Sequence, residues 1–175
     1  ARLRVLADQN DWHQRALAYE TIFTGKFALS YVQSFIRDAH RADRDGKTYY
    51  ENVYMHQEEL YWRPILSWID EMQGISSVVD IGAAYGTLLS YVVLNKGCKH
   101  AYAIDPVDYM SITLRRNLGI TLIRADFERE TIDLPIRFDL ILFTECIERL
   151  NFNPLPTLIK IRKLLNPGGS LLLST

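Results

Sequence analysis

The sequence predicts an α/β fold, a doubly wound and mainly parallel sheet that follows a helical N-terminal extension. From Val78 onward, short apolar runs alternate with amphipathic helical segments. The runs are apolar throughout, which is typical of parallel strands covered on both faces. Residues 1–75 instead place apolar residues at helical spacing. We therefore expect a helical cap over 1–75 and an α/β domain over 76–175.

Composition indicates a globular chain with one core. The 175 residues are 48% hydrophobic and 23% charged, and the net charge is -1. This balance gives no electrostatic reason to expect nucleic acid or an anionic membrane as a partner. No apolar run reaches the ~18 residues that span a bilayer, and the first residues lack the pattern of a signal peptide. Cys98 and Cys146 have no metal-ligand spacing, which favours a cytoplasmic protein.

Three helices are expected in the N-terminal part. The first follows Asn10 and carries apolar residues from Trp12 to Phe23, and the second covers 29–39. A charged loop, 41–47, leads to a third helical region over 50–73, which Pro64 either kinks or divides. Gly74 suits the residue after its end. The apolar side of this third region is expected to be formed by Tyr61, Ile65, Trp68, Ile69 and Met72.

Strands and helices alternate in the second part. Gly97 and Gly119 stand just past two of the helices, and the turn 166–169 ends the third. The expected strands are 78–81, 100–104, 120–124, 138–143 and 170–174. The expected helices are 86–95, 107–117 and 155–165.

The turn after the first strand, in "VVDIGAAYGTLL", carries the strongest signal for a ligand. A parallel strand that ends in such a turn binds its ligand at the carboxyl end of the strand. The dinucleotide fingerprint, aligned on Gly82, requires glycines where the sequence has Ala84 and Thr87. A P-loop also fails, because no Gly-Lys-Ser/Thr follows.

The pattern that fits is acid-x-Gly-x-Gly-x-Gly, read as Asp80, Gly82, Ala84 and Gly86 with alanine at the middle glycine. Here the sequence resembles the class I S-adenosylmethionine-dependent methyltransferases, which have a Rossmann-like fold. S-adenosylmethionine carries a cationic sulfonium and an ammonium group, so an acid near the turn is favourable. The same acid would repel a pyrophosphate.

Later segments extend the resemblance over 78–175. Asp105, about 20 residues after the turn, suits the two ribose hydroxyls. In the family, an acid at Asp126 takes the adenine amino group and Phe127 lines the base, while Thr144 and Glu145 face the methionine part and the acceptor. The helix, Pro-Gly-Gly turn and strand of "LIKIRKLLNPGGSLLLST" also look like the family's. The cofactor-binding residues that the resemblance implies are Asp80, Gly82, Ala84, Tyr85, Gly86, Asp105, Pro106, Asp126, Phe127, Thr144 and Glu145.

One segment departs from the pattern of relatives. The ubiquinone-biosynthesis O-methyltransferases and the small-RNA 3′-terminal methyltransferases have Glu-x-x-Glu-His after the fourth strand, where this chain has Glu145, Glu148 and Arg149. On a helix both glutamates would share a face. Because Arg149 opposes a divalent ion, we expect no metal site. The general base stays open, and Cys146 is interpreted as a small half-buried residue.

Residues of the N-terminal part leave two interpretations open. His56 is either a general base or, more simply, a surface histidine. An aromatic-rich segment either lines an acceptor pocket or packs in the core; it comprises Tyr49, Tyr50, Tyr54, Tyr61 and Trp62.

The family sheet has seven strands in the order 3-2-1-4-5-7-6, whereas this chain reaches Thr175 at the end of strand 5. We expect a sheet truncated after strand 5. Its open edge would favour self-association.

The resemblance implies methyl transfer from S-adenosylmethionine to a small-molecule or glycan-linked acceptor. Three alternatives remain: an RNA-terminal methyltransferase, a nicotinamide-dependent oxidoreductase and a non-catalytic cofactor-binding module.

Overall fold

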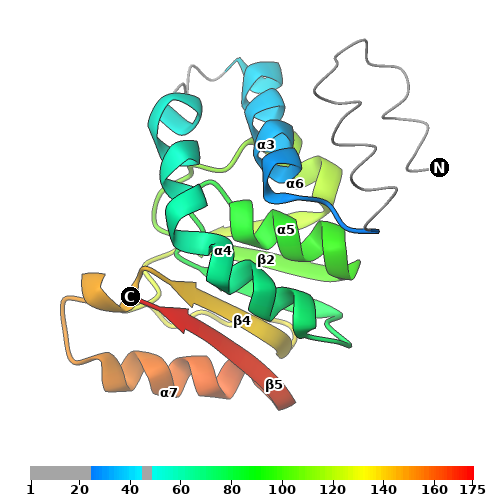
Figure 1. Ribbon diagram of the computed structural model, residues 1–175. Coiled ribbons are helices and arrows are strands. Elements are labelled where there is room, and N and C mark those ends of the chain that lie inside the picture. The colour runs from blue at the N-terminus through cyan, green and yellow to red at the C-terminus, as the bar shows by residue number, and fades with distance from the viewer. Residues whose placement is uncertain (1–24, 45–48) are drawn as a thin grey trace.

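The fold is a five-stranded parallel sheet with helices on both faces, as the sequence predicts (Figure 1). The computed structural model describes residues 25–44 and 49–175, so the helix expected between Asn10 and Phe23 lies outside the described residues. Within those residues, no helix is both long and apolar enough to cross a membrane.

The five strands lie in the order β3-β2-β1-β4-β5, and every neighbouring pair is parallel. Their bounds are Ser77–Ile81 for β1, His100–Asp105 for β2, Ile120–Arg124 for β3, Phe138–Thr144 for β4 and Leu165–Ser174 for β5. The chain leaves β1 toward β2 on one side and returns to β4 on the other. This reversal of strand order creates the crevice in which open α/β sheets bind ligands.

The last strand begins earlier than expected. The sequence predicts a turn at 166–169, but β5 already pairs at Leu165, opposite Phe138. The register then shifts, so that Leu140 pairs with Ser170. Gly168, with φ 80°, lies among the extra residues of β5 that this register shift introduces between Leu165 and Ser170. Among the described residues, β5 pairs only with β4, so it forms an edge of the sheet.

Helices α3 to α6 cover one face of the sheet and α7 covers the other (Figure 1). The α-helices are α3 (Leu29–Asp43), α4 (Met55–Glu71), α5 (Thr87–Lys96), α6 (Ile112–Leu118) and α7 (Pro154–Leu164). A π-helical turn, η1 (Tyr50–Tyr54), precedes α4, and a 3-10 turn, η2 (Ile147–Arg149), follows β4.

Two helix predictions need correction. Helix α6 starts later than the predicted residue 107, because the Ser111 hydroxyl caps it by accepting a hydrogen bond from the Leu114 N–H at 3.1 Å. The charged loop predicted from residue 41 starts only at Arg44, since α3 continues to Asp43. Helix α4 passes through Pro64 without a break.

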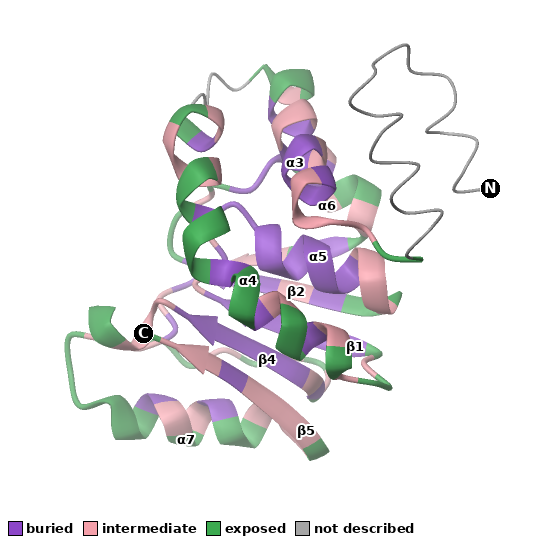
Figure 2. Ribbon diagram, viewed as in Figure 1, coloured by how far each residue is buried: buried purple, intermediate pink, exposed green. Residues whose placement is uncertain are grey.

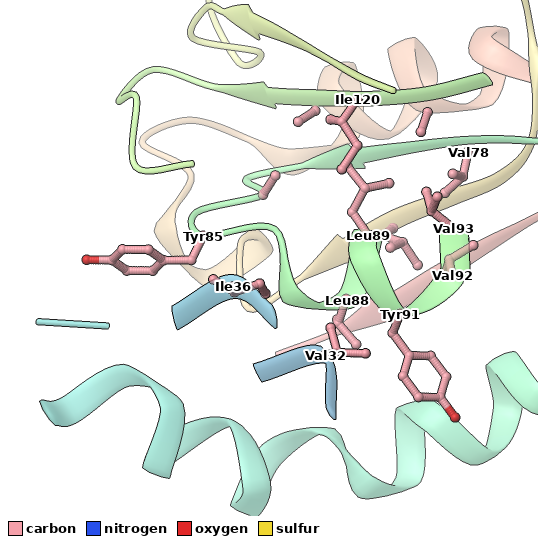
Figure 3. Packing of buried hydrophobic residues seen from close by; sticks show 14 of the residues in the cluster. Val32, Ile36, Val78, Tyr85, Leu88, Leu89, Tyr91, Val92, Val93 and Ile120 are labelled. Carbon is pink, nitrogen blue, oxygen red and sulfur yellow. The ribbon is translucent and has the colours of Figure 1, made fainter. Parts of the chain in front are cut away.

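Alternate residues of the central strands supply the two halves of the core. Val78, Leu140 and Leu142 face α3, α4 and α5, whereas Val79 and Ile141 face α7. Figure 3 shows Val32 and Ile36 of α3 near Leu88 of α5. Strand β4 is buried along its length and β5 only in part (Figure 2). This two-sided burial explains why the strands are apolar throughout.

The buried side of α4 differs from the predicted one. Tyr61 and Trp68 were expected in the core, but they are 59% and 52% exposed. The buried residues are Glu58, Trp62, Ile65 and Ile69, which share one face at spacings of four, three and four. The prediction is confirmed for Ile65 and Ile69 and wrong for Tyr61 and Trp68, because the true buried face includes an acid, which a count of apolar residues rejects.

Asp139 connects three strands at the end of the sheet opposite the crevice. Its Oδ2 accepts hydrogen bonds from Ser76 N, Ser77 N and Ser77 Oγ, each at 3.0 Å. Its Oδ1 accepts one from Asn166 Nδ2 at 2.7 Å. Burial acts to raise the pKa of Asp139, but these hydrogen bonds outweigh it and lower the pKa.

Replacing Asp139 should therefore destabilise the sheet. Asp139→Asn loses the charge that the three serine donors satisfy, so we expect the free energy of unfolding at neutral pH to fall by about 2 kcal/mol. A lowered pKa contributes stability above the unfolded-state pKa, and this is lost as pH falls through the folded-state pKa. The deficit measured by urea denaturation should thus shrink below pH ~4. The exposed Asp133→Asn is the control, and equal stability of both variants would contradict the assignment.

Candidate functional site

A cavity of about 1000 Å³ lies at the carboxyl ends of β1, β2 and β4. The turn after β1 forms its floor, and α4 forms the opposite wall. Every residue of the predicted cofactor set except Gly86 lines it: Asp80, Gly82, Ala84, Tyr85, Asp105, Pro106, Asp126, Phe127, Thr144 and Glu145.

The regular spacing of small residues in the turn after β1 reflects the backbone conformation of that turn. Gly82, Ala84 and Gly86 all have positive φ, at 80°, 46° and 78°. Glycine adopts this region without strain, whereas alanine there costs about 1 kcal/mol. The alternating pattern in the sequence is therefore three left-handed positions, and Ala84 occupies the middle one at a cost that its neighbours must offset.

Gly86 shapes the turn but does not line the cavity. It is the residue before the first turn of α5, and a Cβ there would meet Met110 Cε at 2.4 Å. The expected close approach of Gly86 to a ligand is therefore not seen in the cavity lining. Its freedom is needed for the chain reversal into α5 and for the space that Met110 fills.

Asp105 holds the turns after β1 and β2 together. Its Oδ2 accepts a hydrogen bond from Ala84 N at 3.0 Å, and its Oδ1 accepts one from Val107 N at 2.8 Å. Each carboxylate oxygen can accept a second hydrogen bond. Asp105 can thus organise the site and still receive hydroxyl groups of a ligand.

Asp80 is the most unusual acid in the cavity. It is 3% exposed at the end of β1. Burial, followed by the nearby charge of Asp105, raises the pKa of Asp80 to about 8. Two acids side by side in a buried cavity are unfavourable unless a cation joins them, so this end of the cavity suits a positively charged group.

The segment after β3 forms a tight turn around Asp126. The Asp126 Oδ1 accepts hydrogen bonds from the N–H groups of Glu128 at 3.0 Å and Arg129 at 3.3 Å. Lys160 of α7 donates to the carbonyls of Phe127, Glu128 and Glu130 and lies over the Phe127 ring, 5.8 Å from its centre. Asp126 and Phe127 are held at the cavity, but one oxygen of the Asp126 carboxylate already accepts hydrogen bonds within its own turn.

Glu145 ends β4 in a left-handed conformation, with φ 52°. Its N–H donates to Ser174 O at 3.1 Å, and its Oε1 accepts from Ser174 Oγ at 2.8 Å. Glu145 is therefore not on a helix, and the condition under which Glu145 and Glu148 would share a face is not met. Glu148 pairs with Arg149 and does not line the cavity, whereas Arg149 does.

The sequence analysis considered two other reactive side chains, Cys146 and His56. Burial, together with the charges of Asp80 and Glu148, raises the pKa of Cys146 to about 12. Its thiol donates to Ile81 O at 3.4 Å, which suits a packing role. His56 is exposed and does not line the cavity. Across 25–44 and 49–175, no three His, Cys, Asp or Glu side chains gather as metal ligands would.

Helix α4 and the segment before it supply an aromatic wall. Tyr49, Tyr54, Tyr61 and Trp62 line the cavity, while Tyr50 is 1% exposed and belongs to the core. Tyr54 contacts the Tyr85 ring, with 4.9 Å between ring centres. Four of these aromatic residues thus line the cavity, and Tyr50 packs in the core.

Glu58 also lines the cavity, and the sequence analysis missed it. It is 2% exposed, and burial raises its pKa to about 7. Its Oε2 accepts hydrogen bonds from Gln33 Nε2 at 3.0 Å and from the Tyr50 hydroxyl at 3.3 Å. The one available signal was its helical spacing to Trp62, Ile65 and Ile69, which places an acid on a buried face.

Gly82 should be sensitive to substitution because of Cys146. A Cβ at Gly82 would lie 2.2 Å from Cys146 Sγ, so Gly82→Ala should lower the free energy of unfolding by about 3 kcal/mol. In a Cys146→Ala background the loss should shrink by at least ~1 kcal/mol, measured as a coupling energy in a double-mutant cycle. Gly97→Ala, with φ 66° and open space, reports the backbone strain alone. Zero coupling would show that the contact does not limit this position.

Glu58 should make stability depend on pH. A raised pKa contributes stability that is complete below the unfolded-state value of 4.5 and is lost as pH rises through about 7. Glu58→Gln keeps an acceptor for Gln33 and Tyr50, so over this window it should gain up to about 3 kcal/mol relative to the unchanged protein. Urea denaturation from pH 4.5 to 8 measures the difference. The exposed neighbour Glu59→Gln should not alter the pH profile; matching profiles for both variants would contradict the burial argument.

Comparison with solved structures supports the same fold. The plantazolicin methyltransferase BpumL, in complex with a monoazolic desmethylPZN analog and SAH, aligns with a TM-score of 0.54 and 16% identity over 81% of this chain and 61% of its own. An O-methyltransferase family protein from Burkholderia thailandensis aligns with a TM-score of 0.54 and 14% identity over 83% of this chain and 51% of its own. This chain thus spans less than two thirds of either protein. No curated protein matches the sequence.

A sequence model described as a methyltransferase domain matches residues 26–175, which include the turn at Gly82 and every strand of the sheet. The chain therefore belongs to the methyltransferase-domain family, and its resemblance to the class I S-adenosylmethionine-dependent methyltransferases is confirmed.

Proposed function

We propose that this protein transfers a methyl group from S-adenosylmethionine to a small-molecule or glycan-linked acceptor. The observation that carries the proposal is Asp80, a buried acid beside Asp105 at the floor of the cavity. S-adenosylmethionine supplies an electrophilic methyl group on a cationic sulfonium. Its positive charge would compensate the negative charges of Asp80 and Asp105.

The residues present fit such a cofactor. Asp105 retains acceptor capacity for two hydroxyl groups while it fixes the backbone of Ala84 and Val107. Phe127 offers an apolar surface, and Asp126 an acceptor, at the neighbouring strand end. Asp80 and Glu145 lie on the remaining part of the floor. The chain's contribution to the reaction is to hold two reactants in line and to exclude water.

The same charges weigh against two alternatives. A nicotinamide dinucleotide would bring its pyrophosphate to the turn, where Asp80 and Asp105 repel it and where Ala84 and Thr87 replace the required glycines. An RNA-terminal substrate would bring phosphates to a cavity whose lining holds a single basic residue, Arg149. A small acceptor without phosphate fits these charges better.

Calorimetry with the purified protein tests the proposal. S-adenosylmethionine and S-adenosylhomocysteine should bind and NAD should not. Asp105→Ala should weaken binding at least about tenfold, or ~1.4 kcal/mol, with the circular dichroism spectrum unchanged. The exposed Asp133→Ala is the matched control. Binding of NAD without S-adenosylmethionine would refute the proposal, and cofactor binding without turnover of any acceptor would favour a non-catalytic module.

A further inference from the structure

The α4 wall of the cavity is not used by the proposed cofactor site. The residues assigned to the cofactor come from the turn after β1 and from the ends of β2, β3 and β4. The opposite wall is formed by Tyr54, Gln57, Glu58, Tyr61 and Trp62. This wall is a surface that a second reactant in the cavity can contact.

Glu58 is the ionisable acid of this wall. Burial raises the pKa of its carboxyl, and it outweighs hydrogen bonding with the side chains of Thr87, Gln33 and Tyr50, which acts to lower the pKa. Its Oε2 accepts hydrogen bonds from Gln33 and Tyr50, which fix the orientation of the group. Its Oε1 is buried and accepts no hydrogen bond from the part of the chain that the structure describes. A buried acceptor without a donor is unfavourable by roughly 1–3 kcal/mol. A positive charge that enters the cavity beside Glu58 would offset this cost through Coulomb attraction.

The surroundings of Glu58 favour a cationic donor. The hydroxyl of Tyr54, one turn away, lies within the electrostatic reach of both Glu58 and Asp80, and burial followed by these two charges raises its pKa. Tyr54, Tyr61 and Trp62 line the cavity together with Glu58. Tyrosine and tryptophan faces attract ammonium groups, and they do so more strongly when water is excluded.

The charges that line the cavity disfavour an anionic acceptor. The lining of the cavity holds six acids and one base: Glu58, Asp80, Asp105, Asp126, Glu128, Glu145 and Arg149. Four of these acids already accept hydrogen bonds. Asp105 and Asp126 accept them from backbone N–H groups, Glu128 accepts them from Asn151 and Phe152, and Glu145 accepts one from Ser174. Arg149 is 78% exposed at its side chain and pairs with Glu148. An anionic acceptor would meet repulsion from Glu58 and Asp80 with no buried cation to offset it.

We propose that the methyl acceptor carries an ammonium group, and that Glu58 attracts this group to the aromatic wall formed by η1 and α4. The ammonium group serves recognition, and the methyl group goes to another atom of the acceptor that has a free electron pair. This inference rests on the proposed function, because it names the acceptor class of the same cavity. Glu58 then determines specificity. It supplies the negative charge that attracts the ammonium group, while Gln33 and Tyr50 hold Oε2.

Three ligands with a common skeleton test the charge preference: 2-phenylethylamine, 2-phenylethanol and 3-phenylpropionate. Each is titrated by NMR into the protein saturated with S-adenosylhomocysteine. The amine should bind at least tenfold more tightly than the alcohol, and the carboxylate should bind most weakly. Glu58→Gln should abolish the preference of the amine over the alcohol, and the exposed Glu59→Gln should preserve it.

Each other outcome overturns the inference. In one outcome, S-adenosylhomocysteine binds but the amine binds no more tightly than the alcohol, or does not bind at millimolar concentration. The methyltransferase proposal then stands, and the amine acceptor is refuted. A Glu58→Gln variant that keeps the amine preference refutes the role of Glu58. If that variant instead loses affinity for S-adenosylhomocysteine, Glu58 belongs to the cofactor site. No binding of S-adenosylhomocysteine by the unchanged protein refutes the proposed function and this inference together.

Discussion

The hydrogen bonds of the Asp105 carboxylate to Ala84 N and Val107 N are the contacts on which the site depends. They join the turns that follow two neighbouring parallel strands, which the contact between the Tyr85 and Tyr109 rings also connects. A charged acceptor makes each bond stronger than a neutral one would be. The backbone of the first turn is thereby fixed in a conformation that its own sequence only partly favours, since Ala84 has a positive φ.

The buried acids show that stability and binding make opposite demands on this chain. Asp80 and Glu58 are both raised in pKa by burial, so each destabilises the folded state when it ionises. Asp139, at the other end of the sheet, has its pKa lowered by hydrogen bonds and contributes stability at neutral pH. Asp139 lies where the strands begin, whereas Asp80 and Glu58, whose pKa values burial raises, line the cavity at the carboxyl ends of the strands.

Sequence predicted the sheet well because parallel buried strands have a plain signature. The apolar runs at Val78 and at Leu140 are buried on both faces, and the glycines past the helices mark left-handed ends. Sequence failed where tertiary contacts decide. The phase of α4 depends on an acid, Glu58, that is buried only because Gln33 and Tyr50 come to it from other segments. The left-handed conformation of Glu145 has no signal in the sequence either, because Ser174, 29 residues later, holds its backbone.

Ala84 has a consequence for the entropy of binding. A glycine at this position would reach both signs of φ, and the free turn would sample a broad set of conformations. An alanine has a small left-handed basin, and the hydrogen bond to Asp105 keeps it there. The turn therefore loses little conformational freedom when a ligand settles on it. The strain is present before the ligand arrives, so the free energy of contact is not consumed in ordering the backbone.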